Sequence, residues 1–235
     1  LAKIPQKPQE AFYYRMVIVK AQKLDNLGKF AAMNLLEFWT GKASENKYEP
    51  ESGIQSWQNW FAETYPDESP ATLSEESTEQ KWTVSLLLEV LNDKSASKGS
   101  KVNGKKVFKS AQCSNCHRNL NFGDSVGPDL TTVSRRFTNR EIIEAIVHPS
   151  DVISDQYRSE LIATIDGRQL TGLTSLGPND TVSILTEDGK KTQLENDEIE
   201  ARKKSKKSVM PENLLEKLSR QEIIDLFTYM GLKDE

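Results

Sequence analysis

The stretch Cys113-Ser114-Asn115-Cys116-His117 contains both cysteines of the chain and one of its two histidines. Two cysteines that lie three positions apart exclude a disulfide framework of the kind that staples small secreted domains. Both thiols are therefore available for another task, and an imidazole follows them directly.

This stretch matches the C-x-x-C-H signature of covalent haem attachment. When two cysteines share one helical turn, their sulfurs reach the two vinyl groups of one porphyrin edge, and the next residue turns its imidazole onto the iron. We therefore predict one covalently bound haem c, with Cys113 and Cys116 as its anchors and His117 as the proximal iron ligand.

Two other uses of the paired cysteines compete with haem attachment. A redox disulfide of the thioredoxin kind requires a preceding strand and a parallel sheet, and the sequence shows neither. A structural zinc site needs four ligands, and beyond Cys113, Cys116 and His117 the only other usual nitrogen or sulfur donor is His148.

The composition of the 235-residue chain is that of a globular protein, with 28% charged and 36% apolar residues. No apolar run approaches the roughly 20 residues of a spanning helix, so we expect no membrane span in this fragment. The formal net charge of -4 argues against a nucleic-acid partner. Because the chain begins at Leu1 without a leader, we expect a mature or excised fragment.

Apolar periodicity divides the chain into two parts. Residues 9–39 and a stripe around Trp57 and Trp60 predict a helical first domain over 1–97, and a polar stretch places the boundary near Lys98. The two tryptophans indicate core packing between helices, with a ligand platform as the alternative. Another helix is expected over about 78–91.

The second part, 98–235, combines helices with short strands. Helices are expected over 105–111, over 139–147 with Thr138 and Glu141 as a capping box, and from Ser219 to a stop at Gly231. Turn signals separate five strand candidates, which cover 157–165, 169–175, 181–186, 191–194 and 198–202. The predicted fold class is mainly α, with a small antiparallel β insertion at about 151–203.

Further motifs around the haem signature are similar to those of a known family. They are Gly104, Phe108, Gly127-Pro128-Asp129-Leu130, Met210-Pro211 and Leu226-Phe227-Thr228-Tyr229. Together they resemble a class I cytochrome c, so the second part is expected to be a cytochrome c fold interrupted by the strand-rich insert.

A narrower resemblance covers residues 104–232. It is to the Planctomycete/Verrucomicrobium-type haem-binding domain, the C-terminal module of larger dehydrogenase-like or helical-repeat proteins. The residues that carry it are Pro149-Ser150, Ile153, Tyr157, Asp166-Gly167, Gly172 and Ser208-Val209-Met210-Pro211.

This resemblance implies roles for individual residues. Met210 corresponds to the distal iron ligand, and a thioether opposite an imidazole raises the reduction potential. Pro128 corresponds to the residue whose carbonyl accepts a hydrogen bond from the proximal histidine, although a simple turn proline is the alternative. Gly104 corresponds to a position where the first helix crosses the last. His148 is the rival distal ligand, or an ordinary helix-terminal histidine.

Two basic groups are further candidates for contact with the haem or with its partner. Arg135 and Arg136 are expected either to pair with haem propionates or to form a solvated surface. The run at 202–207 is expected either to be a solvated face or to steer an acidic redox partner.

The predicted function is electron transfer by a single haem that cycles between Fe(III) and Fe(II), rather than enzymatic catalysis. The expected partner is a redox donor or acceptor protein, or a dehydrogenase domain of the same parent chain, with the helical part as scaffold. Because haem attachment of this type takes place outside the cytoplasm, a periplasmic or otherwise extracytoplasmic location is expected. A peroxidase-like haem enzyme and a gas-sensing or ligand-sensing module are the alternatives.

Overall fold

The computed structural model describes residues 7–74, 80–93 and 98–232. The chain forms two compact units: one takes residues up to Glu75 together with Ser150–Gln156, and the other takes Glu76–Pro149 and Tyr157–Glu235. The predicted boundary near Lys98 therefore falls inside the second unit. None of the described helices is both long and apolar enough to cross a membrane.

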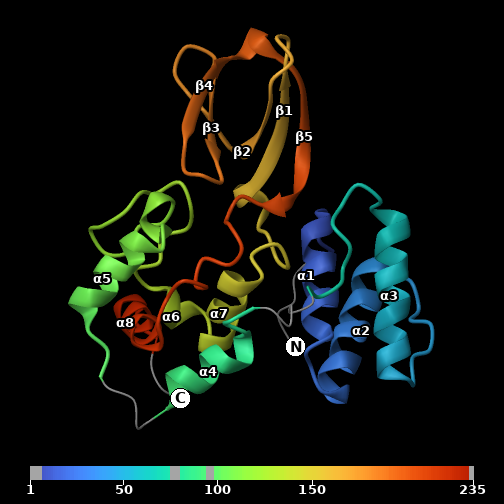
Figure 1. Cartoon of the computed structure of the whole chain (residues 1–235). Coiled ribbons are helices and arrows are strands. Elements are labelled where there is room, and N and C mark those ends of the chain that lie inside the picture. Colours follow the sequence, from blue (N-terminus) through green and yellow to red (C-terminus); the bar gives the residue numbers. More distant parts are fainter. Residues whose placement is uncertain (1–6, 75–79, 94–97, 233–235) are drawn as a thin grey trace. The chain divides into compact units, whose positions relative to one another are not determined.

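Three helices form the first unit: α1 (Ala11–Ala21), α2 (Asn26–Thr40) and α3 (Pro50–Thr64) (Figure 1). Each buries one apolar stripe against the other two, as the periodicity predicts. Trp57 is only 2% exposed, and its indole Nε1 donates to Ser44 Oγ at 2.9 Å. Its ring centre lies 5.2 Å from that of Trp60, so this pair belongs to the core.

The segment Ser150–Gln156 belongs to the first unit although it was predicted as the start of the β insertion. The carboxylate of Asp151 accepts hydrogen bonds from the backbone N–H of Ser74 at 3.0 Å and from its hydroxyl at 2.5 Å. The buried guanidinium of Arg15 donates to the Asp151 carbonyl. These polar contacts are between residues far apart in sequence, so no local pattern reveals them.

Five helices carry the core of the second unit: α4 (Val84–Asn92), α5 (Lys101–Ser110), α6 (Val133–Arg136), α7 (Asn139–Val147) and α8 (Arg220–Met230). The predicted capping box of Thr138 and Glu141 is confirmed at the start of α7. A second box, of Ser219 and Glu222, starts α8, and Gly231 ends that helix in the left-handed conformation at φ 82°.

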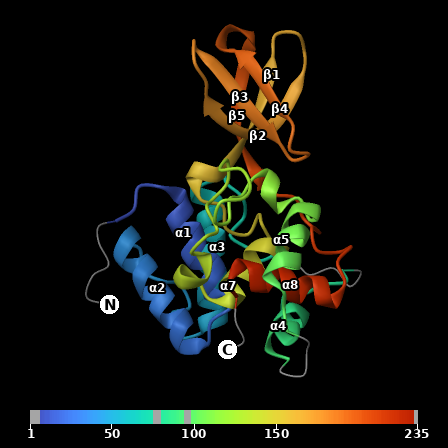
Figure 2. The ribbon, with the colours of Figure 1, turned by 90° about the vertical axis from the view of Figure 1, so that its left-hand side faces the viewer.

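Helices α5 and α8 cross in close contact (Figure 2). A Cβ added to Gly104 would lie 2.0 Å from the carbonyl oxygen of Asp225 and 2.6 Å from the Cβ of Tyr229. One turn further along α5, the ring of Phe108 meets the ring of Tyr229 edge to face, with centres 5.5 Å apart. The close approach expected at Gly104 is therefore present.

The inserted sheet contains β1 (Arg158–Thr164), β2 (Gln169–Leu176), β3 (Thr181–Thr186), β4 (Lys191–Glu195) and β5 (Ile199–Ser208). The strands pair antiparallel in the order β4-β3-β2-β1-β5, so the last strand returns to the first. Ile162, Ile184 and Leu194 form the centre of a small core of the sheet's own.

The fold class is mixed α/β rather than mainly α, with 43% of the described residues in helices and 18% in strands. The strand prediction was most in error at β5, which runs for ten residues, whereas a strand was expected only over 198–202. An edge strand tolerates consecutive lysines because one edge and much of its side-chain surface face water. The basic run is therefore part of the strand.

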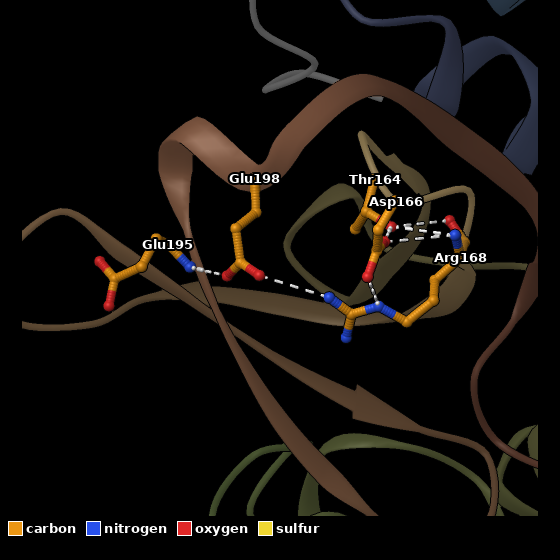
Figure 3. Close-up of polar contacts among 5 residues, drawn as sticks. All are labelled: Thr164, Asp166, Arg168, Glu195 and Glu198. Carbon is orange, nitrogen blue, oxygen red and sulfur yellow. Dashed lines mark hydrogen bonds and ion pairs between the residues drawn. The ribbon is translucent and has the colours of Figure 1, made fainter.

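A network of polar contacts joins the β1–β2 turn to the segment before β5 (Figure 3). Arg168 Nε donates to Asp166 Oδ2 at 2.7 Å, and Arg168 Nη2 donates to Glu198 Oε1 at 3.3 Å. Glu198 Oε2 in turn accepts from the backbone N–H of Glu195 at 2.8 Å. The network fixes the segment between the end of β4 and the start of β5, the strand that pairs with β1.

The crossing of α5 and α8 gives the first prediction. Gly104→Ala is expected to lower the free energy of unfolding by about 2 kcal/mol, because the new methyl group has no room against α8. At an open helical site the same change stabilises a protein by about 1 kcal/mol. Urea unfolding would measure the difference, with the exposed neighbour Lys106→Ala as control. A Gly104→Ala protein as stable as the parent would contradict the packing.

Candidate functional site

The attachment turn begins directly after α5. Gln112 adopts the left-handed conformation at φ 64°, which ends the helix and redirects the chain into a 3₁₀ turn at Cys113–Asn115. The carbonyl of Cys113 accepts from the backbone N–H groups of Cys116 at 3.3 Å and His117 at 2.9 Å. The two cysteines and the histidine are therefore carried by one short turn, as the spacing predicts.

The imidazole of His117 is oriented by one backbone contact. Its Nδ1 lies 2.9 Å from the carbonyl oxygen of Pro128, so Nδ1 carries the proton and donates it, which leaves the lone pair of Nε2 for another partner. Burial lowers the pKa of His117 more than this hydrogen bond raises it. A neutral ring with a free Nε2 is the form that ligates a metal.

Two glycines let the following loop close around the histidine. A Cβ on Gly127 would lie 3.0 Å from ring atoms of His117. Gly123 has φ +99°, and a Cβ there would lie 2.1 Å from the His117 carbonyl oxygen. Sequence reasoning identified Gly127 within its motif but missed Gly123, because a lone glycine in a loop gives no signal of what approaches it.

The two thiols lie in different apolar surroundings. Cys113 packs against the helical core, whereas Cys116 packs against Leu173, Leu185 and Val209. Burial raises the pKa of Cys113 to about 12 and also raises the pKa of Cys116, where the Asp124 charge adds to the effect. Both groups therefore remain protonated at neutral pH.

These surroundings disfavour the two competing uses of the cysteines. Redox and zinc-binding cysteines act as thiolates, which need a lowered pKa. The sheet is antiparallel and follows the cysteines in sequence, unlike the preceding strand that a thioredoxin-like site requires. Across the described ranges, no group of three or more His, Cys, Asp or Glu side chains is placed to hold a metal ion.

The inserted sheet contacts the attachment turn directly. Lys191 Nζ at the start of β4 lies 2.7 Å from Asp124 Oδ2 in the loop after His117. At the β3–β4 turn, a Cβ on Gly189 would lie 3.2 Å from Asn115 Nδ2. The sheet therefore covers the side of the turn that carries Cys116, a role that sequence analysis did not assign to it.

Met210 lies just beyond the end of β5 and is half-buried. Its neighbour Val209 packs in the same apolar cluster as Cys116. A cavity of about 750 Å³ is lined by Gln112, which precedes Cys113, and by Pro211, which follows Met210, together with residues of the sheet. The fold thus brings the segment of Met210 to that of Cys113, although the two residues are 97 positions apart in the sequence.

The remaining candidates lie in less specific places. His148 ends α7, and its backbone N–H donates to the Glu144 carbonyl at 2.8 Å. Arg136 donates to the Asp129 carbonyl at 3.1 Å, so it braces the loop that holds Pro128. Arg135 is exposed and lines a separate groove. The basic side chains at 202–207 line the exposed edge strand.

The donor set fits a c-type haem. The two thiols are not joined in a disulfide, and they emerge from the turn that also carries His117. Among the hydrogen bonds of the described residues, the ring of His117 uses only Nδ1, so Nε2 remains for the iron. Cys113 and Cys116 would hold the porphyrin, and His117 would ligate its metal.

The loop that positions Pro128 gives a pH prediction. Hydrogen bonds from Thr131, together with Arg118, lower the pKa of Asp129 from 3.8 to about 2. Because the folded pKa is depressed, ionised Asp129 stabilises the fold above about pH 4, and that contribution is lost as the pH falls toward 2. Carboxyl-carbon NMR should show this low midpoint, and Thr131→Val should raise it. An unchanged midpoint in the variant would contradict the assigned cause.

Comparison with known proteins agrees with this geometry. Residues 102–231, more than half of the chain, match the family model Cytochrome c. A domain of this family implies covalently bound c-type haem with iron. No curated protein matches the chain. The match contains the attachment turn, the loop of Pro128, the inserted sheet and Met210, and the chain therefore belongs to the cytochrome c family.

Proposed function

We propose that this protein is a one-electron carrier whose haem iron is ligated by His117 and Met210. Membership of the cytochrome c family supports haem-based electron transfer in general. The observation that carries the proposal is the 2.9 Å contact between His117 Nδ1 and the Pro128 carbonyl, made by a turn that also presents both cysteines. This contact supports the proposal because it holds the imidazole in the orientation and tautomer that an iron ligand needs.

Each part of the site has a defined task. The haem, when bound, supplies the ferric/ferrous couple. Pro128 holds the tautomer and the ring plane of His117, and Met210 would supply a thioether that favours the ferrous state. The apolar contacts of Cys116 with Leu173 and Leu185 exclude water from that side, which also favours the less charged state.

The proposed setting is extracytoplasmic, in the periplasm or an equivalent compartment. Cytochrome c domains are typically extracytoplasmic. We further propose that the chain is a module of the Planctomycete/Verrucomicrobium type, which serves a dehydrogenase-type partner while the first unit acts as scaffold. The separate three-helix core of that unit supports this division of labour.

The basic side chains of β5 are proposed to steer an acidic redox partner. Arg202, Lys203, Lys204, Lys206 and Lys207 are exposed in a chain whose net charge is -4. The strand leads directly into Val209 and Met210, so the positive charge lies next to the proposed ligand segment. Such a local field raises the rate of encounter with an acidic protein at low ionic strength.

The test of cofactor attachment uses protein expressed with haem-maturation machinery. The parent protein should retain a pigment after denaturation, whereas a Cys113→Ala/Cys116→Ala double variant should release it. Haem-stained denaturing gels would show the difference. A parent protein without retained pigment would sink the proposal.

The test of the distal ligand compares Met210→Ala with His148→Ala. Met210→Ala should lose the long-wavelength methionine-to-iron band of the ferric spectrum, and its reduction potential should fall by on the order of 100 mV or more. His148→Ala should leave both unchanged. An unaltered six-coordinate low-spin spectrum in Met210→Ala would refute the assignment. Rapid carbon monoxide uptake by the reduced parent protein would favour a ligand-sensing module or an enzyme instead.

A further inference from the structure

A second hollow lies in the second unit and shares no lining residue with the cavity that Gln112 and Pro211 line. This groove of about 720 Å³ is lined by the start of α5, the loop after His117, α6 and the end of α8. Its lining includes Asn119, two residues after His117, whose side-chain amide donates to the Tyr229 carbonyl at 3.0 Å. The groove is therefore fixed to the same loop that carries the proximal histidine.

Three large apolar side chains stand exposed along the groove. Val102 is 72% exposed, Leu120 is 58% exposed and Phe137 is 48% exposed. Single exposed apolar residues are common on protein surfaces, but a group that gathers around one hollow marks an interaction site.

The backbone of Leu120 adds a second observation. Its φ of 56° lies in the left-handed region, which a leucine rarely adopts. The conformation is held because the Leu120 N–H donates to Thr131 Oγ1 at 2.9 Å and because Asn119 and Phe122 form an isolated β-bridge. The loop thus presents a large apolar side chain from a position that asparagine or glycine would fill with less strain.

The charged residues of the groove all have the same sign. Lys101, Lys105 and Arg135 line it, and no acidic residue is among the described residues of the lining. Lys105 Nζ also lies 4.5 Å from the centre of the Phe122 ring, which belongs to the loop after His117. The chain as a whole carries a net charge of -4, so the groove is a local exception.

We propose that this groove docks an acidic segment of a partner protein, with an apolar side chain inserted among Val102, Leu120 and Phe137. Carboxylates of that segment face Lys101, Lys105 and Arg135. An apolar centre with a polar rim is the usual anatomy of a protein interface. This inference rests on the proposed function at one point, which is that the partner is a redox protein.

The binding test uses a fluorescein-labelled peptide with a central Leu-Phe pair and three acidic residues on each side. Its fluorescence anisotropy is titrated with the haem-loaded protein at low salt. Leu120→Asn should weaken binding about tenfold, since it removes one apolar anchor. Asparagine accepts the left-handed backbone, so the fold is retained. Leu176→Asn is the matched control, because Leu176 is 87% exposed on β2, outside the groove.

The charge test uses two neighbouring lysines of α5. Lys105→Glu should weaken peptide binding severalfold at low salt, and added salt should narrow the difference. Lys106→Glu makes the same change on an exposed residue outside the groove lining and should have a smaller effect. A peptide with Gln and Asn in place of its acidic residues should bind more weakly to the parent protein.

Three results would overturn the inference. The first is that Leu120→Asn and Leu176→Asn bind the acidic peptide equally well. The second is that the parent protein binds the acidic and the neutral peptide equally well. The third is that the parent protein binds no peptide but forms a dimer, which Leu120→Asn abolishes. Haem spectra of each protein keep this test separate from the proposed function. If the protein binds the peptide but shows no haem redox couple, the docking inference stands and only the proposed electron transfer is refuted.

Discussion

The hydrogen bond from His117 Nδ1 to the Pro128 carbonyl is the contact on which the site depends. It joins the attachment turn to the far end of the loop that follows, and it selects the tautomer that leaves Nε2 for a metal. The loop closes this tightly only because Gly123 and Gly127 lack side chains where they meet His117. Orientation of the ligand and closure of the loop are therefore one structural feature.

The crossing of α5 and α8 supports this loop from the other side. Asn119 donates to the Tyr229 carbonyl at 3.0 Å, and the Tyr229 hydroxyl donates to the Asn119 carbonyl at 3.2 Å. The buried carboxylate of Asp225 accepts from the backbone N–H of Ser100 at 2.8 Å, which fixes the start of α5. Helices α5 and α8 thus hold the attachment turn and the loop that follows it.

The inserted sheet gives the site a wall that a minimal cytochrome c lacks. One face of the sheet packs on Cys116, and the Lys191–Asp124 ion pair joins the start of β4 to the loop after His117. The last strand then delivers Val209 and Met210 to the same side. An insertion between the segments of His117 and Met210 therefore adds cover without separating them.

Local sequence determined the features that local chemistry controls. The attachment turn, the capping box of α7, the end of α8 at Gly231 and the antiparallel hairpins all follow from side chains within a few residues of one another. The match to the cytochrome c family covers residues 102–231, the range that contains these motifs. The residues proposed to hold the haem were all named from sequence.

Only the tertiary structure decided the relations between distant segments. The length of β5 depends on pairing with β1, which allows a lysine-rich run to form an edge strand. The roles of Gly123, Asn119 and Lys191 depend on partners that are 6, 110 and 67 positions away, respectively. A sequence pattern records what a residue can do, but its partner is set by packing of the whole domain.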